Sequence, residues 1–195
     1  MDPTTQKNRD TDVPLKEQIH DLYELVDNMK TGLLCTRRSD GFLVSRAMSV
    51  ASRAKGIDFW LFTNNQSHKL EELAHDPHVN LAFFRDSTQE WVSISGKARV
   101  VDDRNRIREL YTPTLRAWLG DLGDGTHDGG KDDPRLSLIY LETHSVCYAL
   151  KDKGALGRAM EMAKGVVTGN VPKMQSIREL GADEVTLART LETEP

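Results

Sequence analysis

Apolar and polar positions alternate through most of the middle of the chain, and this period of two predicts strands. In residues 42–50, one strand face carries bulky apolar side chains and a single charge, Arg46, while the other face is mostly small. Gly96 interrupts a long alternating segment, so we expect a bulge or bend there. The other predicted strands are residues 32–37, 57–62, 79–85, 90–101, 136–142 and 145–150.

Segments with helical periodicity lie before and between these predicted strands. Apolar residues recur at helical spacing from Pro14 to Met29, which predicts a helix packed on the sheet. Ser67 is a suitable N-cap for a second helix, which the Asp76–Pro77 pair would end. Two further helices are predicted at residues 102–111 and 113–119, before a glycine- and aspartate-rich loop at residues 120–134.

Changes in composition suggest three segments. Residues 1–12 are polar and are predicted to be a disordered N-terminal tail. Residues 13–152 hold all the strand signals and form the predicted β-domain. From residue 153 to residue 195 the strand signals stop, and we expect a helical C-terminal extension interrupted by glycine and proline.

Composition limits the classes of function. The chain has 195 residues, 38% of them hydrophobic and 29% charged, with a net charge of -4 and a pI near 5.9. An acidic balance argues against a nucleic-acid surface, which needs clustered lysine and arginine. Cys35 and Cys147 lie far apart in apolar stretches and are predicted to be reduced. Without an export segment or an apolar run of membrane length, we expect a cytoplasmic protein with no membrane partner.

Two cationic features go beyond what a fold requires. Arg46 stands among bulky apolar neighbours, so its charge must reach water, pair with an acid at the rim of the sheet, or meet an anion. Ser67 and Lys69 lie at a predicted helix start, where free N–H groups and the helix dipole favour phosphate. The residues alone leave the paired arginine and the anion site both open. His75 and His78 do not predict a metal site, because no third ligand stands near and Pro77 breaks the geometry.

Four short segments, in this order along the chain, carry a family resemblance. Residues 45–49 (Ser-Arg-Ala-Met-Ser), 59–63 (Phe-Trp-Leu-Phe-Thr), 67–70 (Ser-His-Lys-Leu) and 91–98 (Trp-Val-Ser-Ile-Ser-Gly-Lys-Ala) resemble the flavin-binding split barrels related to pyridoxamine 5'-phosphate oxidase. The branch they are most similar to is that of the general stress proteins, which includes fungal blue-light-inducible members. The resemblance implies a mainly β fold, a Greek-key-like split β-barrel of about six strands with flanking helices. It also implies a homodimer with FMN at the interface.

The resemblance assigns roles to individual residues. The FMN phosphate would meet Arg46, Ser67 and Lys69, while His68 stands where the oxidase pattern has arginine and would contact phosphate weakly or only begin the helix. Trp118 and the turn at residues 131–134 would reach the cofactor of a second subunit. The flavin ring would lie near Met48, Ser49, Phe62, Thr63 and Trp91.

The chain departs from the parent oxidase in two places. Ala51 stands where the oxidase pattern has lysine, and the oxidase's Arg-x-His-x-Arg signature has no match after residue 150, so oxidation of pyridoxamine phosphate is not expected. Phosphate anchoring serves FAD as well as FMN, whereas haem is disfavoured because no histidine follows residue 150. No residue stands out as a general acid or base. A flavin-dependent oxidoreductase in stress response and a non-catalytic protein that sequesters or senses flavin are the two functional hypotheses.

Overall fold

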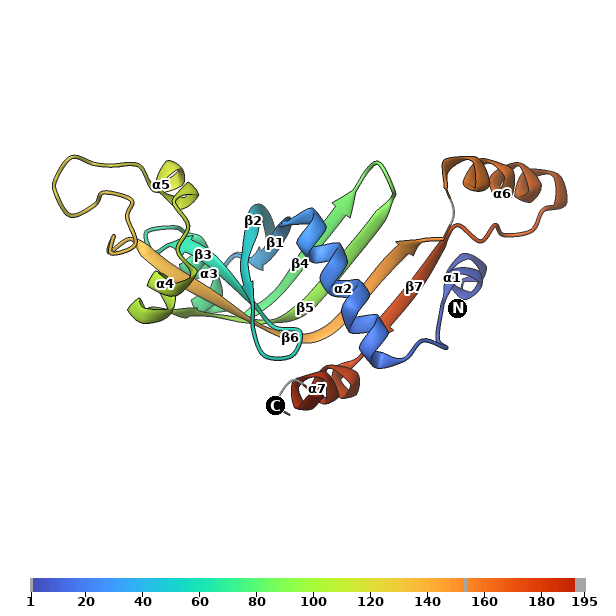
Figure 1. Ribbon diagram of the computed structural model, residues 1–195, viewed down its shortest axis with the longest axis horizontal. Helices are drawn as coiled ribbons and strands as arrows, with labels where there is room; N and C mark the ends of the chain where they lie inside the picture. The colour runs from blue at the N-terminus through green and yellow to red at the C-terminus, as the bar shows by residue number, and fades with distance from the viewer. Residues whose placement is uncertain (1, 153, 192–195) are drawn as a thin grey trace.

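The computed structural model describes residues 2–152 and 154–191 and is built on one antiparallel sheet (Figure 1). The strand order is β3-β2-β1-β4-β5-β6-β7, and an additional pairing of β3 with β6 closes the first six strands into a barrel. The fourth strand returns to lie beside the first, which is a Greek-key arrangement. The predicted mainly β split barrel is therefore confirmed. The strands are β1 Thr31–Arg37, β2 Leu43–Arg53, β3 Phe59–Asn64, β4 His78–Arg85, β5 Glu90–Val101, β6 Leu136–Lys151 and β7 Gln175–Leu180.

The alternating residues fill the interior of the barrel as the pattern predicts. Leu34, Leu81 and Ile94 are fully buried, and each contributes about 1.5–3 kcal/mol of hydrophobic stabilisation. Helix α2, Leu15–Met29, packs its buried apolar face onto this core, in agreement with the predicted helix. Two predicted strands at the end of the domain are in fact the single 16-residue strand β6.

A bulge lets β5 and β6 stay paired around the bend of the barrel. The register shifts between Ser95 and Gly96, as the interruption of the pattern predicts. A Cβ atom at Gly96 would lie 2.1 Å from the carbonyl oxygen of Glu142, so only glycine fits this close approach.

The barrel opens between β2 and β3. Their pairing ends at Val50 and Leu61, although β2 continues beside β1 as far as Leu43, and β3 continues beside β6 as far as Asn64. Helix α3, Lys69–His75, follows β3 and contacts both β1 and β5. The diverging strand edges and the start of α3 therefore meet at the split of the barrel.

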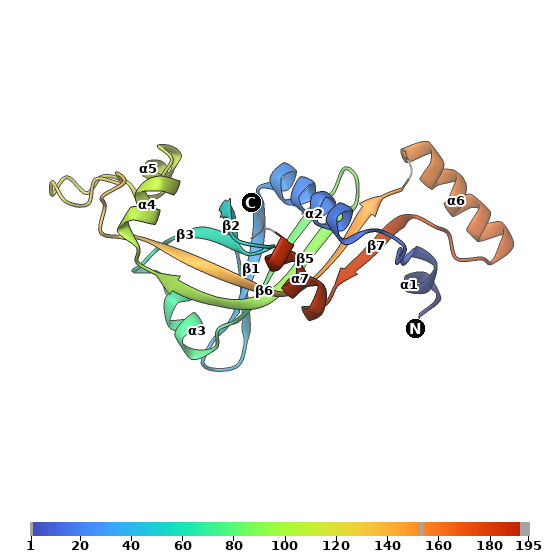
Figure 2. The same ribbon diagram turned by 60° about the horizontal axis from the view of Figure 1, so that its bottom comes forward.

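Smaller helices extend the molecule at its two ends (Figures 1 and 2). Helices α4, Arg104–Leu110, and α5, Thr114–Leu119, lie at the end nearer α3, close to their predicted positions. Beneath α4, Ile107, Leu136 and Leu138 form a second hydrophobic cluster. Helices α1, Pro3–Asn8, and α6, Ala155–Thr168, lie at the opposite end, and α7, Ala182–Leu191, ends the described chain.

The C-terminal extension is not wholly helical, so that prediction was wrong. Strand β7 pairs with the second half of β6, and its inward positions include Ser176 and the buried Arg178. Arg178 is held by ion pairs with Asp10 and Asp21. Polar residues at inward positions hid the strand, because the pattern of a half-buried strand requires apolar residues there.

The N-terminal residues are ordered against the same strand, which corrects the predicted tail. Asp2 caps α1 by accepting hydrogen bonds from the N–H groups of Thr4 and Thr5. The buried Asn8 accepts hydrogen bonds from the N–H groups of Met174 and Gln175. These partners are more than 160 residues away in sequence, so composition could not reveal them. No described helix combines the length and the hydropathy needed to cross a membrane.

Candidate functional site

Arg46 and Lys69 come together at the split of the barrel. The side chain of Lys69, the first residue of α3, is buried, with only 8% of the residue exposed. Its Nζ donates hydrogen bonds to Thr63 Oγ1 at 3.0 Å and to Ser67 Oγ at 2.7 Å. A buried ammonium is thus held by two neutral hydroxyl groups.

Arg46 projects from the inner face of β2 and is held by a carboxylate. Its Nη2 lies 3.0 Å from Oε1 and 2.7 Å from Oε2 of Glu72, and its Nη1 donates to Thr36 Oγ1 at 2.7 Å. The Thr36 hydroxyl donates in turn to Glu72 Oε2 at 2.5 Å. We call Thr36, Arg46, Thr63, Ser67, Lys69 and Glu72 the cationic cluster.

Charge is unbalanced in the cationic cluster. Burial lowers the pKa of Lys69, the charge of Arg46 lowers it further, and Glu72 opposes them. Burial by itself would raise the pKa of Glu72, but hydrogen bonds from Thr36 and Arg46 outweigh it and hold that pKa below its ordinary value. Across the described part of the chain, no carboxylate forms an ion pair with Lys69. The cluster therefore holds two cations but only one carboxylate, which pairs with Arg46, and this excess of positive charge attracts an anion.

The start of α3 differs in detail from the prediction. His68, not Ser67, occupies the N-cap position, and no side chain caps the helix. The Ser67 hydroxyl accepts a hydrogen bond from Lys69 instead, because the ammonium competes for it. The His68 side chain is 92% exposed and lies 3.8 Å from Glu71, so the structure leaves it outside the cluster.

The residues that were predicted to contact the flavin ring lie on different faces of the sheet. Thr63 is buried within the cationic cluster, whereas its neighbour Phe62 packs on the second hydrophobic cluster. The side chain of Met48 lies in the barrel core. Ser49 is on the outer face of β2, where its hydroxyl lies 2.9 Å from that of Thr31. Of these four side chains, only that of Thr63 is part of the cluster.

Trp91 is distant from the cluster of its own chain. It lies on the outer face of β5, opposite the inward-facing Val92. The part of β5 next to α3 is marked by Ala98, whose N–H donates to the carbonyl of Pro77. Trp91 precedes Ala98 by seven positions, or about 20 Å along a strand. Among the described contacts, none joins the Trp91 side chain to the cluster of the same chain.

The sequence reasoning missed Glu72 and Thr36. Glu72 follows Lys69 by three positions on the same helix, so it falls on the same face, and this spacing was an available signal. Thr36 is in register with Val44, two positions before Arg46, and is 1% exposed. Its role depends on the pairing of β1 with β2, which local sequence does not specify.

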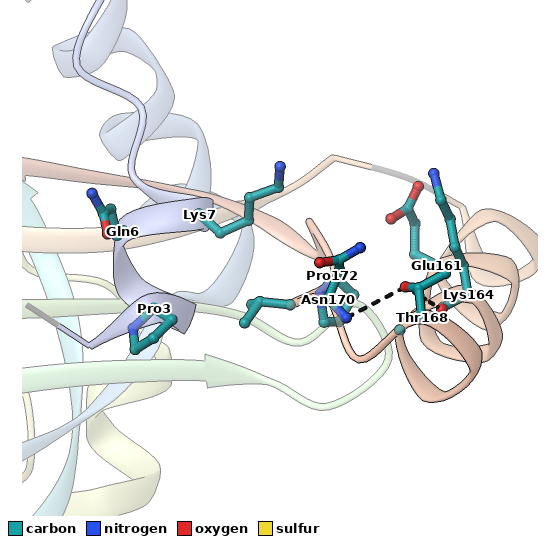
Figure 3. Close-up of a pocket in the computed structure, with 10 residues that line it drawn as sticks. Pro3, Gln6, Lys7, Glu161, Lys164, Thr168, Asn170 and Pro172 are labelled. Carbon is teal, nitrogen blue, oxygen red and sulfur yellow. Dashed lines mark hydrogen bonds between the residues drawn. The ribbon is translucent and has the colours of Figure 1, made fainter.

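Two hollows in the surface lie elsewhere. A groove of about 840 Å³ runs along the outer sheet face beside α7, where Asp76, His78, Lys97 and His144 are among its lining residues. A smaller hollow of about 590 Å³ separates α1 from α6, with Lys7, Glu161 and Lys164 at its edge (Figure 3). Neither hollow includes a predicted site residue. Within residues 2–152 and 154–191, no group of three or more His, Cys, Asp or Glu residues could hold a metal ion.

Sequence relatives cover most of the chain. Protein bli-3 of Neurospora crassa is 41% identical over 186 residues, which are 94% of this chain and 89% of that protein. General stress protein 26 of Bacillus subtilis is 24% identical over 128 residues, which are 64% of this chain and 83% of that protein.

Solved structures share the fold. A Clostridium acetobutylicum protein related to general stress protein 26 has a TM-score of 0.62 at 18% identity, covering 89% of this chain and 99% of that chain. A pyridoxamine 5'-phosphate oxidase-related, FMN-binding protein of Nostoc punctiforme has a TM-score of 0.55 at 14% identity, covering 70% of this chain and 84% of that chain. The family model described as "Pyridoxamine 5'-phosphate oxidase like" matches residues 17–173. With this match and the relatives above, the chain belongs to the pyridoxamine 5'-phosphate oxidase-like family.

Proposed function

We propose that this protein binds FMN noncovalently at the cationic cluster and works as a flavin-dependent oxidoreductase in stress response. The observation that carries the proposal is the buried ammonium of Lys69, which has hydroxyl partners but no carboxylate in the described chain and lies beside a second cation, Arg46. A buried charge without a counter-ion is costly, and a ligand phosphate would supply that counter-ion.

The residues present fit a phosphate monoester. Arg46 and Lys69 would donate charge-assisted hydrogen bonds, which are about twice as strong as neutral ones. The Ser67 hydroxyl lies 2.7 Å from Lys69 Nζ and would turn to the same phosphate. Bound FMN would supply the redox chemistry, while the chain would orient the cofactor and exclude water. The FMN-binding protein of Nostoc punctiforme, which has this fold, supports the choice of flavin.

We infer that a second copy of the chain completes each site. The outer faces of β1, β2 and β4 expose Leu33, Leu43 and Phe84 by 53%, 65% and 60%. Small residues such as Ala47 and Ala82 lie opposite Leu33 in the sheet, which permits close contact. A two-fold contact through this face would include Trp91, which is in register with Phe84 on the same side of the sheet. Trp118 on α5, which is 88% exposed, is also free to approach a partner.

The test is a spectrum of the purified protein with added FMN, recorded before and after anaerobic NADPH or NADH. A bound flavin band that bleaches quickly supports the oxidoreductase, and binding without bleaching supports a flavin carrier or sensor. Sedimentation equilibrium tests the dimer, for which a mass near twice 21.9 kDa is expected. Absence of flavin binding contradicts the proposal.

A further inference from the structure

We infer that Glu72 is a positioning residue that holds the Arg46 guanidinium in place for a ligand phosphate, an inference that rests on the proposed flavin site. The Glu72 side chain is 11% exposed, and both of its oxygens lie within 3.0 Å of Arg46 Nη2. A carboxylate so enclosed fixes the plane and the direction of the guanidinium.

A second contact supports the same geometry from another element. Thr36 belongs to β1 and is 1% exposed, so its hydroxyl is fixed by the sheet. It accepts a hydrogen bond from Arg46 Nη1 and donates one to Glu72. Arg46 is therefore held between a strand and a helix, and its loss of side-chain freedom occurs on folding rather than on binding.

Glu72 pairs with Arg46 and leaves Lys69 without a carboxylate partner in the described chain. Its carboxylate makes no ion pair with Lys69 in the described structure, whereas it contacts Arg46 with both oxygens. The charge of Arg46 lowers the pKa of Lys69 and that of Glu72 opposes it, so both charged groups act on the ammonium. A phosphate held by the Lys69 ammonium would be placed to accept from the Arg46 N–H groups that do not donate to Glu72 or Thr36.

Substitution of Glu72 could either strengthen or weaken FMN binding, so the direction of the change in FMN affinity is informative. A negative charge near a phosphate repels it, so removal of the charge alone would strengthen FMN binding. Loss of positioning would weaken FMN binding, by about tenfold if one charge-assisted hydrogen bond is lost. We expect positioning to dominate in Glu72→Ala. Glu72→Gln keeps an acceptor oxygen and should bind FMN at least as tightly as the wild type.

Fluorescence titration with FMN and with riboflavin, which lacks the phosphate, tests the inference. Glu71→Ala is the matched control, since it removes an adjacent carboxylate whose side chain is 84% exposed and does not contact Arg46. The inference predicts that only Glu72→Ala loses FMN affinity and that riboflavin affinity stays equal in all four proteins. Equal or tighter FMN binding by Glu72→Ala overturns the inference, as does a parallel loss of riboflavin.

Failure of the proposed function is distinguishable from failure of this inference. If the wild type binds no FMN, the flavin proposal fails, and the same proteins are titrated with inorganic phosphate and followed through the side-chain N–H resonances of Arg46. Weaker phosphate binding by Glu72→Ala than by the wild type and Glu72→Gln then supports positioning. Equal or tighter binding, or no phosphate binding by the wild type, overturns it.

Discussion

Two clusters of buried charged residues in this molecule differ in the balance between positive and negative groups. At α7, Asp58 accepts hydrogen bonds from Arg189 Nη2 at 2.7 Å, from the Tyr140 hydroxyl at 2.6 Å and from the Thr143 N–H at 2.8 Å. One carboxylate meets one guanidinium, and neutral donors complete its shell. In the cationic cluster, the single carboxylate of Glu72 pairs with Arg46, and Lys69 has two hydroxyl partners and no carboxylate partner in the described chain.

This difference in charge balance distinguishes a cluster that stabilises the fold from a cluster that is suited to bind a ligand. Asp58, whose side chain is 2% exposed, directly precedes β3 and has its partners on β6 and α7, so the cluster at α7 fastens the C-terminal helix to the barrel. Burial and the hydrogen bond to Asp58 raise the pKa of Tyr140 to about 12, which keeps the hydroxyl a donor. An uncompensated buried cation has no such structural role, and perturbed groups of this kind are typical of functional sites.

The largest expected effect is loss of FMN affinity when both cations of the cationic cluster are removed. Arg46→Ala with Lys69→Ala should weaken FMN binding by about 3–6 kcal/mol, at about 1.5–3 kcal/mol for each charge-assisted hydrogen bond. Isothermal titration calorimetry on the folded double variant measures it. An unchanged Kd would remove the phosphate assignment.

Removal of the guanidinium at α7 should affect stability instead of binding. Arg189→Ala leaves Asp58 buried without its cation, and we expect a loss of about 3 kcal/mol in the free energy of unfolding. Urea unfolding measures the loss, and FMN affinity of the folded variant serves as the control. A loss of FMN affinity comparable to that of the double variant would contradict the separation of the two clusters.

A smaller change in stability, a gain instead of a loss, is expected from a substitution in the cationic cluster. Lys69→Met removes a buried cation that Arg46 repels, so the ligand-free protein should gain about 1 kcal/mol in stability while FMN binding is weakened. Thermal unfolding with and without FMN measures both quantities. A destabilised ligand-free variant would indicate that Lys69 is there for the fold.

The smallest effect is a dependence of stability on pH. The pKa of Lys69 in the folded protein lies below its ordinary value of 10.5, so between these two values the unfolded chain binds more protons. Stability of the ligand-free protein should therefore rise as pH increases through this window. Below the lowered pKa, Lys69 is protonated in both states, and the full cost of burying its charge is present. Urea unfolding at several pH values compares the wild type with Lys69→Met, which should lack this contribution. Identical slopes of the unfolding free energy against pH in the two proteins would show that folding does not lower the pKa of Lys69.

The sequence predicted the strands of the barrel because their inward positions are apolar, as Leu34, Leu81 and Ile94 show, and the family resemblance implied that these strands form a split barrel. It did not predict β7, whose inward residues Ser176 and Arg178 are polar; Ser176 donates to Asp152, and Arg178 pairs with Asp10 and Asp21 near the other end of the chain. Long-range pairing of polar groups leaves no local pattern.

The candidate site was predictable in part for the same reason. Arg46, Lys69 and Ser67 could be placed together from their residue types and the family resemblance, and the structure brings them into one region. The residues alone left an acid or an anion open as the partner of Arg46, and the resemblance implied the phosphate; the structure shows an acid, Glu72, in contact with Arg46. Trp91 could not be placed, because its distance from the cluster depends on the curvature and register of β5.

The most direct measurement compares FMN with riboflavin on the wild-type protein by quenching of flavin fluorescence. The two ligands share the ring and the ribityl chain and differ only in the phosphate. If the unbalanced charge of Arg46 and Lys69 binds that phosphate, FMN should bind at least about 100-fold more tightly than riboflavin, given about 1.5–3 kcal/mol for each of two charged contacts. Equal affinities, or no binding of either flavin, would contradict the account.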